Sequence, residues 1–262
     1  MLRIEDLTFA YREKPVLDNI SLSIVKGEII GIIGPNGCGK TTLLKHLNRN
    51  LDPNVGRVML NDSDLNDLTK TEIARNIASV PQTNEIRFSF TARDIVTMGR
   101  MPFLEKFSGE STEDIKIVEN AMERTNILDF ADRYINTMSG GERQRVIIAR
   151  ALAQTPEIIL LDEPTLHLDI SNQFDALDLV KKLSDEDGLT VVIVSHDLPM
   201  VVRYCDRIVM LKDHKIFAIG TPEEVLTPEN MKEIFNIDAV LEKDDRTGQN
   251  IVRIFGSCTN KE

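Results

Sequence analysis

Residues 34–42 combine glycines, a lysine and threonines at the spacing of a phosphate-binding loop. They read Gly-Pro-Asn-Gly-Cys-Gly-Lys-Thr-Thr, which fits G-x-x-x-x-G-K-T, between an apolar run at 28–33 and a helix-favouring segment at 42–48. Glycines let consecutive backbone N–H groups turn toward an anion, and the positive end of the following helix points at the same place. Lys40 can reach the β- and γ-phosphates, and the Thr41 hydroxyl can coordinate Mg²⁺. A glycine turn that binds nothing is the alternative, and the match of strand, loop and helix argues against it.

Two carboxylates follow a second apolar run. Asp162 and Glu163 come directly after residues 158–161, whose four consecutive apolar side chains are typical of a strand buried on both faces of a parallel sheet. Ligands of open α/β sheets bind at the carboxyl ends of the strands. Asp162 therefore suits an Mg²⁺ ligand, and Glu163 can orient and deprotonate an attacking water. Solvated loop acids are the weaker alternative.

Three further side chains stand at the ends of expected strands. His196 follows the strand at 190–194, beside the expected phosphate crevice. Gln82 follows the strand at 77–80 and by itself is best interpreted as a surface amide. Tyr11 can be an ordinary strand aromatic or a face on which adenine stacks, an interaction of about 1–3 kcal/mol. The residue types alone leave both readings of Tyr11 open.

A serine and two glycines open a later helix. Ser139 and Glu142 have the spacing of a capping box before a helix at 143–154. Gly140 and Gly141 are unusual there, because each weakens the helix start by about 1 kcal/mol relative to alanine. What they provide is bare backbone N–H at the positive end of a helix, which a phosphate can approach closely.

The apolar pattern predicts strands on both sides of a helical segment. Short strands are expected within 2–30, at 56–61, 77–80, 158–161 and 190–194, and a hairpin at 207–211 and 215–218. A polar helix near 70–75, a helix near 230–235 and a strand at 251–254 complete the prediction.

Helix signals dominate residues 83–155. Thr91 and Ser111 each begin a capping box that ends in an aspartate three residues later. Gly99 is expected to stop the first of these helices, with Pro102 beyond it. We interpret this segment as a mostly helical insertion in an α/β core.

Composition limits the classes of partner. The 262 residues include 31 Lys and Arg against 42 Asp and Glu, a net charge of −11, which argues against a broad nucleic-acid surface. The three cysteines are far apart and odd in number, which predicts a reducing compartment without a disulfide framework. No apolar run approaches the roughly 18–20 residues that span a bilayer, so we expect another chain to cross any membrane at which this one acts.

Taken in order, these residues resemble the motifs of ATP-binding subunits of ATP-binding cassette (ABC) transporters. The resemblance covers nearly the whole chain, and the signature, 23 residues before Asp162, distinguishes ABC proteins from other P-loop NTPases. Met138 and Glu142 replace the commoner Leu and Gln of that signature. The loop that ends at Asp169 also departs from the family's commoner wording, and we expect activity to survive these changes.

The resemblance assigns roles to the individual residues. Catalysis is expected from Glu163, His196, Lys40 and Gln82. ATP is expected to bind Tyr11, Gly34, Pro35, Asn36, Gly37, Cys38, Gly39, Lys40, Thr41, Thr42, Ser139, Gly140, Gly141, Glu142 and Asp169. Mg²⁺ is expected at Thr41, Gln82 and Asp162.

The resemblance also implies a fold and domain organisation. It implies an α/β fold: a P-loop NTPase core of mostly parallel sheet, with an N-terminal antiparallel β part and a helical subdomain insertion. One ABC ATPase domain would span residues 1–262. Its parts would be a nucleotide-binding core at 1–82 and 156–220, a helical subdomain at 83–155, and a short C-terminal extension at 221–262.

The sequences of residues 97–102, 139–145 and 220–227 are most similar to those of ATPases of iron–siderophore, haem and cobalamin importers. Such subunits pair head-to-tail with a second copy under membrane permease subunits, which an extracytoplasmic binding protein supplies. The expected location is the cytoplasmic face of the membrane, with no nucleic-acid partner. The alternatives are a soluble ABC ATPase of the iron–sulfur assembly type, or the ATPase of an exporter.

Apolar residues near 83–105 suggest where a permease could dock. The residues concerned are Phe88, Phe90, Met98, Met101, Phe103 and Leu104. An internal hydrophobic staple within the insertion explains them equally well.

Overall fold

Residues 1–82, 89–104 and 109–258 are described by a computed structural model of the chain, which divides into two units. The first comprises Met1–Asp67 and Val192–Glu262, and the second comprises Leu68–Val191. The subdomain boundaries expected from the sequence remain a prediction.

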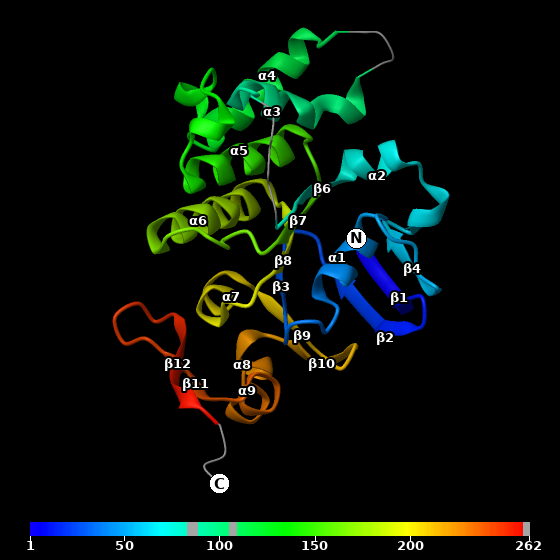
Figure 1. Cartoon of the computed structure of the whole chain (residues 1–262), viewed down its shortest axis with the longest axis vertical. Helices are drawn as coiled ribbons and strands as arrows, with labels where there is room; N and C mark the ends of the chain where they lie inside the picture. Colours follow the sequence, from blue (N-terminus) through cyan, green and yellow to red (C-terminus); the bar gives the residue numbers. More distant parts are fainter. Residues whose placement is uncertain (83–88, 105–108, 259–262) are drawn as a thin grey trace. The chain divides into compact units, whose positions relative to one another are not determined.

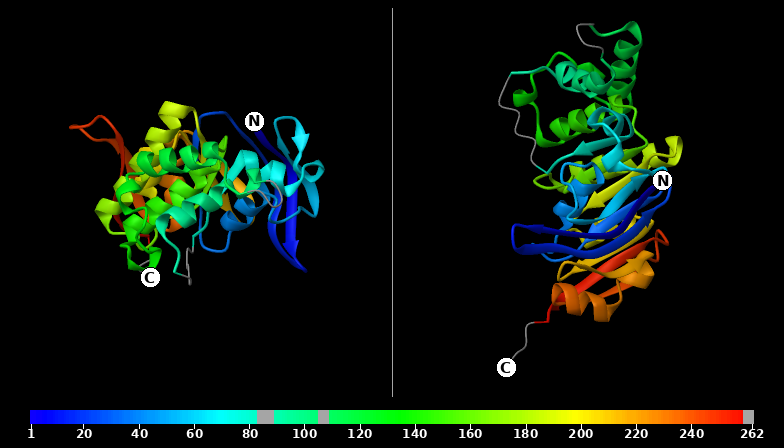
Figure 2. Two further views of the ribbon diagram at one scale, coloured as in Figure 1. Left: turned by 90° about the horizontal axis from the view of Figure 1, so that it is seen from above. Right: turned by 90° about the vertical axis from the view of Figure 1, so that its right-hand side faces the viewer.

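An antiparallel sheet in the first unit begins the chain. Its strands are ordered β2 (Lys14–Ile24), β1 (Leu2–Tyr11), β4 (Val55–Leu60) and β5 (Ser63–Asp64), and β1 and β2 form a long hairpin (Figure 2). Leu2 pairs with Ile24, and every second side chain at the start of β1 is buried, as alternation predicts. Asp6 has a φ of 50°, and the register of β1 shifts beside it.

A second group of strands in this unit carries the glycine-rich loop. Strand β3 (Ile29–Ile33) is buried throughout and runs parallel to β9 (Arg207–Lys212), which pairs antiparallel with β10 (Lys215–Gly220). Asp213 and His214 form the turn of the predicted hairpin, both with positive φ. Strand β8 (Thr190–Val194), also fully buried, contains the position at which the chain passes between the units.

Helices and a C-terminal hairpin complete the first unit. The helices are α1 (Lys40–Leu47), α7 (Leu198–Tyr204), α8 (Pro222–Val225) and α9 (Pro228–Phe235). Helix α7 packs closely on β3, since a Cβ added to Gly31 would lie 2.9 Å from side-chain atoms of Val201 and Cys205. The strand expected at 251–254 lies within β12 (Asn250–Ser257), and its antiparallel partner β11 (Ile237–Lys243) was not expected.

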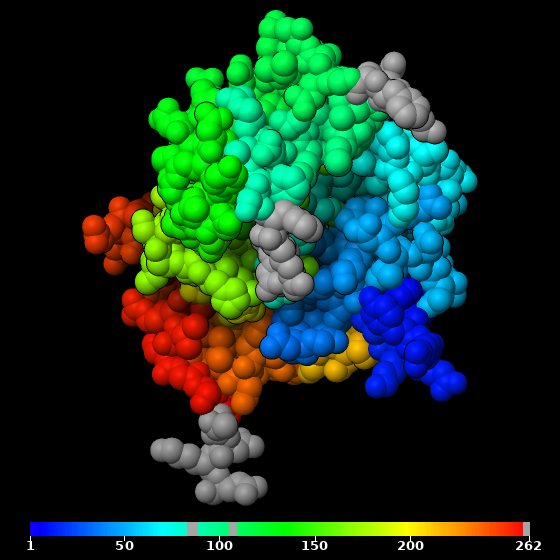
Figure 3. Space-filling model, turned by 45° about the horizontal axis from the view of Figure 1, so that its top comes forward, coloured from blue at the N-terminus to red at the C-terminus, as the bar shows by residue number. Residues whose placement is uncertain are grey.

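The second unit pairs two parallel strands with a group of helices. Strand β6 (Ile77–Val80) pairs with β7 (Ile158–Asp162), with Ile77 opposite Ile158. Its helices are α2 (Lys70–Asn76), α3 (Ala92–Thr97), α4 (Thr112–Arg124), α5 (Gly140–Ala153) and α6 (Ile170–Asp187). Helices α3, α4 and α5 lie side by side (Figure 1), and α4 with the turns after it forms a continuous part of this unit's surface (Figure 3). The mostly helical character expected here is confirmed for the described residues.

The capping boxes at Thr91, Ser111 and Ser139 are confirmed, but the expected role of Gly99 is wrong. Helix α3 already ends at Thr97, and a 3₁₀ helix (Met98–Phe103) continues through Gly99 and Pro102. A Cβ added to Gly99 would lie 2.3 Å from the Arg150 carbonyl oxygen. Gly99 therefore permits close packing on α5 and does not stop the helix.

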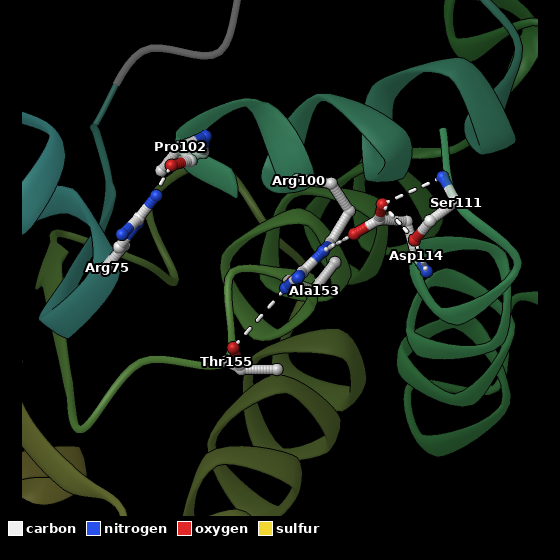
Figure 4. A network of polar contacts seen from close by, with 7 residues as sticks. All are labelled: Arg75, Arg100, Pro102, Ser111, Asp114, Ala153 and Thr155. Atoms are coloured by element: carbon white, nitrogen blue, oxygen red, sulfur yellow. Dashed lines mark hydrogen bonds and ion pairs between the residues drawn. The ribbon is translucent and has the colours of Figure 1, made fainter. Parts of the chain in front are cut away.

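A buried ion pair holds this 3₁₀ helix to α4 and α5 (Figure 4). The Arg100 Nε donates to Asp114 Oδ1 at 2.8 Å, and its Nη1 donates to the Ala153 carbonyl at 2.7 Å. The centroid of the Phe103 ring lies 4.0 Å from the guanidinium carbon of Arg100. Because both charged groups are almost fully buried and hydrogen-bonded to each other, they connect three segments of the unit.

Candidate nucleotide site

The glycine-rich loop joins β3 to α1 as the sequence predicts, and at two of its positions any residue other than glycine would clash with neighbouring backbone. Gly34 has a φ of +147°, and a Cβ there would lie 2.3 Å from the Leu211 carbonyl oxygen. Gly39, the residue before α1, has a φ of +107°, and its Cβ would lie 2.5 Å from the Val16 carbonyl oxygen. The backbone is thus held against β9 and β2 in a conformation that only glycine adopts without strain.

Lys40 lies folded against the loop that it follows. Its Nζ donates to the carbonyls of Gly34 at 2.9 Å and Pro35 at 3.0 Å, and the residue is 8% exposed. The charge therefore stands at the loop, beside the first turn of α1, where Thr41 is partly buried. Cys38 is buried, and burial raises the pKa of its thiol, so this loop residue stays neutral at ordinary pH.

Tyr11 ends strand β1, and the residue is 45% exposed. Phe9 supports it from one side, with ring centroids 4.8 Å apart in an edge-on contact, and Phe9 in turn meets the His46 ring at 4.7 Å. Burial lowers the pKa of His46, whose Nδ1 lies 2.8 Å from the Thr42 carbonyl oxygen. An exposed aromatic held by a fixed support can stack on a base.

His196 is exposed and lies two residues beyond β8, in the short loop that joins β8 to α7. The Asp197 N–H donates to Ser195 Oγ at 3.0 Å, and Asp197 caps α7 by accepting from the Met200 N–H. The first unit thus holds Tyr11, the glycine-rich loop and His196.

The two acidic residues of the second unit lie at the carboxyl end of β7, as the sequence predicts. Asp162 is the last residue of the strand and is 7% exposed. Glu163 is half-buried and has a φ of 50°, a left-handed conformation that is uncommon outside glycine. Such a backbone is found where the surrounding structure fixes it, often at functional sites. Gln82 is exposed, two residues beyond β6.

The segment Ser139–Glu142 forms the N-terminus of α5 with both bonds of its capping box. The Ser139 N–H donates to Glu142 Oε2 at 2.7 Å, and the Glu142 N–H donates to Ser139 Oγ at 3.3 Å. The bond from the Ser139 backbone is the main reason that the pKa of Glu142 is lowered. Arg133 pairs with Glu142 at 3.0 Å. The carboxylate of Glu142 is thus engaged within the helix start.

Asp169 caps the neighbouring helix α6. Its carboxylate accepts from the Asn172 N–H at 2.9 Å, and the Asn172 Nδ2 lies 2.9 Å from both carboxylate oxygens. Neither Asn172 nor helix α6 was predicted from the sequence, although an aspartate such as Asp169 is a favoured N-cap residue that could have marked the start of the helix. Asp169 therefore has a structural partner within its own helix.

The described residues contain no helix that is both long and apolar enough to cross a membrane. Within the second unit, the structure brings the Ser139–Glu142 segment and Asp169 together through α6, because a Cβ on Gly141 would meet the Asn172 side chain. That the residue sets of the two units form one site remains a prediction.

Comparison with known proteins identifies the family. A family model described as "ABC transporter" matches residues 17–166. The iron(3+)-hydroxamate import ATP-binding protein FhuC of Bacillus subtilis is 38% identical, and the match covers 100% of this chain and 97% of that protein. The cobalamin import ATP-binding protein BtuD of Halobacterium salinarum is 40% identical over 89% of this chain, which spans only 58% of that relative.

Two solved structures agree with this assignment. An inward-facing metal-chelate type ABC transporter has a TM-score of 0.86 at 29% identity, and the match covers 97% of this chain and 96% of that chain. A dimeric ATP-binding cassette bound to ADP and Pi in a post-hydrolysis state has a TM-score of 0.72 at 34% identity, covering 85% of this chain and 99% of that chain. The chain therefore belongs to the ABC transporter family, as one of its ATPases.

Proposed function

We propose that this ATPase powers import of an iron–siderophore, haem or cobalamin-type substrate through a separate membrane permease. The observation that carries the proposal is the similarity to the B. subtilis hydroxamate import protein, which extends over the whole chain. The similarity to the metal-chelate type transporter supports the same class of substrate. The site residues supply the means of ATP hydrolysis that such a subunit needs.

In this proposal two copies close head-to-tail around two ATP molecules. Each triphosphate would lie between Lys40 and the loop glycines of one copy and the Ser139–Glu142 helix end of the other. A C₂ dimer of this kind makes two equivalent sites, neither of which is complete in a single copy. The dimeric ADP-bound cassette supports this arrangement. ATP then acts as the joint between the copies, and hydrolysis releases it.

The donor groups suit Mg²⁺. Thr41 offers a hydroxyl, Asp162 a carboxylate at the end of β7, and Gln82 an amide oxygen, all hard oxygen donors of the type that Mg²⁺ prefers. The ion would neutralise charge on the β- and γ-phosphate oxygens. Glu163 would orient and deprotonate the attacking water, and His196 would hold the γ-phosphate.

The permease would dock on the segment around 83–105, of which Phe88 lies outside the described residues. The structure separates two of its apolar residues. Phe103 is partly buried and stacks on Arg100, which favours the internal role, whereas Met101 is 65% exposed and available to a partner. A charged substitution at Met101 should therefore uncouple transport while basal ATPase activity persists.

Co-purification from a detergent extract tests the proposed function. A membrane permease recovered with the chain, together with uptake of a metal chelate or cobalamin that depends on it, is the expected result. Recovery of soluble partners alone would favour the iron–sulfur assembly alternative. An export-type permease, with outward transport of its cargo, would favour the exporter alternative. In an importer we also expect an extracytoplasmic binding protein and a location at the cytoplasmic face of the membrane.

A further inference from the structure

We propose that Asn172 is a positioning residue whose side-chain amide joins Asp169 to Gly141, and so fixes the N-terminus of α5 against the N-terminus of α6. The inference rests on the proposed function, because only in the ATP-joined dimer does the start of α5 act on nucleotide. All three residues belong to the second unit, so the geometry is that of one compact body.

The nitrogen end of the amide faces Asp169. Asn172 Nδ2 lies 2.9 Å from both oxygens of the Asp169 carboxylate, and the Asn172 backbone N–H also donates to Oδ1 at 2.9 Å. A backbone donor alone suffices to cap a helix. The additional bonds from Nδ2 fix the orientation of the Asn172 side chain, since its amide can then rotate only by breaking them.

The oxygen end of the amide fills the space beside Gly141. A Cβ built on Gly141 would lie 2.0 Å from Asn172 Oδ1 and 2.4 Å from its Cγ, so the amide occupies the volume of the missing side chain. Gly140 has a looser neighbour, because its Cβ would lie 3.4 Å from a methyl carbon of Leu168. The backbone of Gly141 is therefore in direct contact with a side chain that α6 holds in place.

The contact with Asn172 explains why residue 141 is a glycine, independently of any ATP binding. Gly141 is small because Asn172 lies against it, and the start of α5 is thereby placed relative to Asp169 before nucleotide binds. A prepositioned helix end loses less conformational entropy when it closes on a ligand. We therefore expect Asn172 to affect formation of the ATP-joined dimer and not the binding of ATP to a single copy.

A purely local role as a helix-start residue is the competing explanation, and the chain offers a matched control. Asn230 occupies the same position in α9: its backbone N–H donates to the cap residue Thr227 at 3.2 Å, and its Nδ2 donates to the Val225 carbonyl at 2.8 Å. It belongs to the first unit. Asn230→Ala removes a side-chain amide bond at the same helix position and keeps the backbone bond, in a helix that carries no predicted nucleotide contact.

The first experiment measures ATP-dependent dimerisation of the full chain in a Glu163→Gln background, by analytical ultracentrifugation with ATP and Mg²⁺. Asn172→Ala should raise the dimer dissociation constant about tenfold. ATP affinity of the single copy should stay within about twofold, because the loop at 34–42 is untouched. Asn230→Ala should leave both quantities unchanged.

The second experiment tests the contact itself, without nucleotide, by thermal unfolding of a double-mutant cycle. Gly141→Ala should lower Tm by several degrees, about 3 °C or more, because its methyl meets the Asn172 amide. In the Asn172→Ala background the same change should cost less than half as much, because the nearest remaining atom of residue 172 is its Cβ, at 3.1 Å. Equal costs in both backgrounds would show that the two residues do not interact.

The two experiments separate failure of this inference from failure of the proposed function. If the Glu163→Gln parent does not dimerise with ATP, the proposed function is wrong, and the positioning role falls with it even where the cycle confirms the contact. If the parent dimerises and Asn172→Ala dimerises equally well, the positioning role alone is overturned.

Discussion

Lys40 is the single side chain on which the proposed binding of ATP depends most directly. Its ammonium donates to two carbonyls of its own loop, so the charge is already held where phosphate oxygens would replace those acceptors. Lys40→Ala should weaken ATP binding by about 10- to 100-fold, the equivalent of one charge-assisted bond of roughly 1.5–3 kcal/mol. Isothermal titration calorimetry with ATP and Mg²⁺ measures this change.

Lys45 provides the control for this substitution. Lys45 is an exposed residue further along α1, so Lys45→Ala removes the same charge from the same helix. Its ATP affinity should remain within about twofold of the wild type. Equal losses for both lysines would mean that only general charge, and not the position of Lys40, contributes to binding.

Residue types and spacing predicted where the candidate site residues stand in the chain, since each lies at or just after the end of a strand, or in the loop or first turn that opens a helix. They did not predict how those side chains are supported. Asn172 and the pair of Phe9 with His46 act through contacts between segments far apart in sequence, which no local pattern records. The left-handed backbone of Glu163 could not be predicted either, because glutamate rarely adopts a positive φ.

Close packing between helices depends on Gly99. A methyl group at this position would lie 2.3 Å from the Arg150 carbonyl oxygen, and backbone cannot move aside as a side-chain tip can. Gly99→Ala should therefore lower the free energy of unfolding by about 1–3 kcal/mol, the usual cost of overpacking. Gly109→Ala is the matched control, with nothing within 4 Å of its Cβ and an expected change within about 0.5 kcal/mol. Urea unfolding distinguishes the two, and equal stability of both variants would contradict the packing seen here.

The buried pair of Arg100 and Asp114 predicts a loss of stability in acid. Hydrogen bonds from Ser111, then the bond from Arg100, lower the pKa of Asp114 from 3.8 to about 2. The unfolded chain therefore binds this proton more readily, so the stabilisation is complete above about pH 4 and disappears as pH falls toward 2. The shift corresponds to about 2 kcal/mol.

Comparison with Asp114→Asn isolates this contribution, because all other carboxylates titrate in both proteins. At neutral pH the variant should be less stable, since Arg100 stays buried without its anion. The difference in unfolding free energy, measured with urea at several pH values, should shrink as pH falls from 4 to 2. A difference that does not change with pH would show that the carboxylate of Asp114 is not held ionised by this pair.

Most helices and strands could be read from the sequence because their signals are local. The capping boxes predicted at Thr91, Ser111 and Ser139 all form, because the bonds they make lie within four residues. Helix α5 nevertheless begins at Gly140, three residues before the predicted start. The role predicted for Gly99 was wrong because a glycine is required there by a contact with α5, some 50 residues further along the chain. Strand β11 was missed because only one of its seven residues is fully buried, so it lacks a clear apolar alternation.

In the proposed dimer, a single copy of the chain holds only part of each nucleotide site. Its first unit contains the loop for phosphate, and its second contains the Ser139–Glu142 helix start, which the proposed dimer presents to the nucleotide of a second copy. No sequence pattern reveals an interface between copies directly, because such a contact joins the ends of elements that a single chain leaves unpartnered. The prediction of a dimer rests on the resemblance to ABC ATPases, and the dimeric structure of a similar cassette supports it.

Glu163→Gln tests this central claim most directly. The change keeps the shape of the side chain but removes the proposed base, so ATP should bind, hydrolysis should fall by about 100-fold or more, and the dimer should persist. Light scattering after gel filtration should give twice the 29.5 kDa chain mass with ATP and Mg²⁺, and the single mass without nucleotide. A variant that stays monomeric with bound ATP, or that hydrolyses ATP at the wild-type rate, would contradict the account.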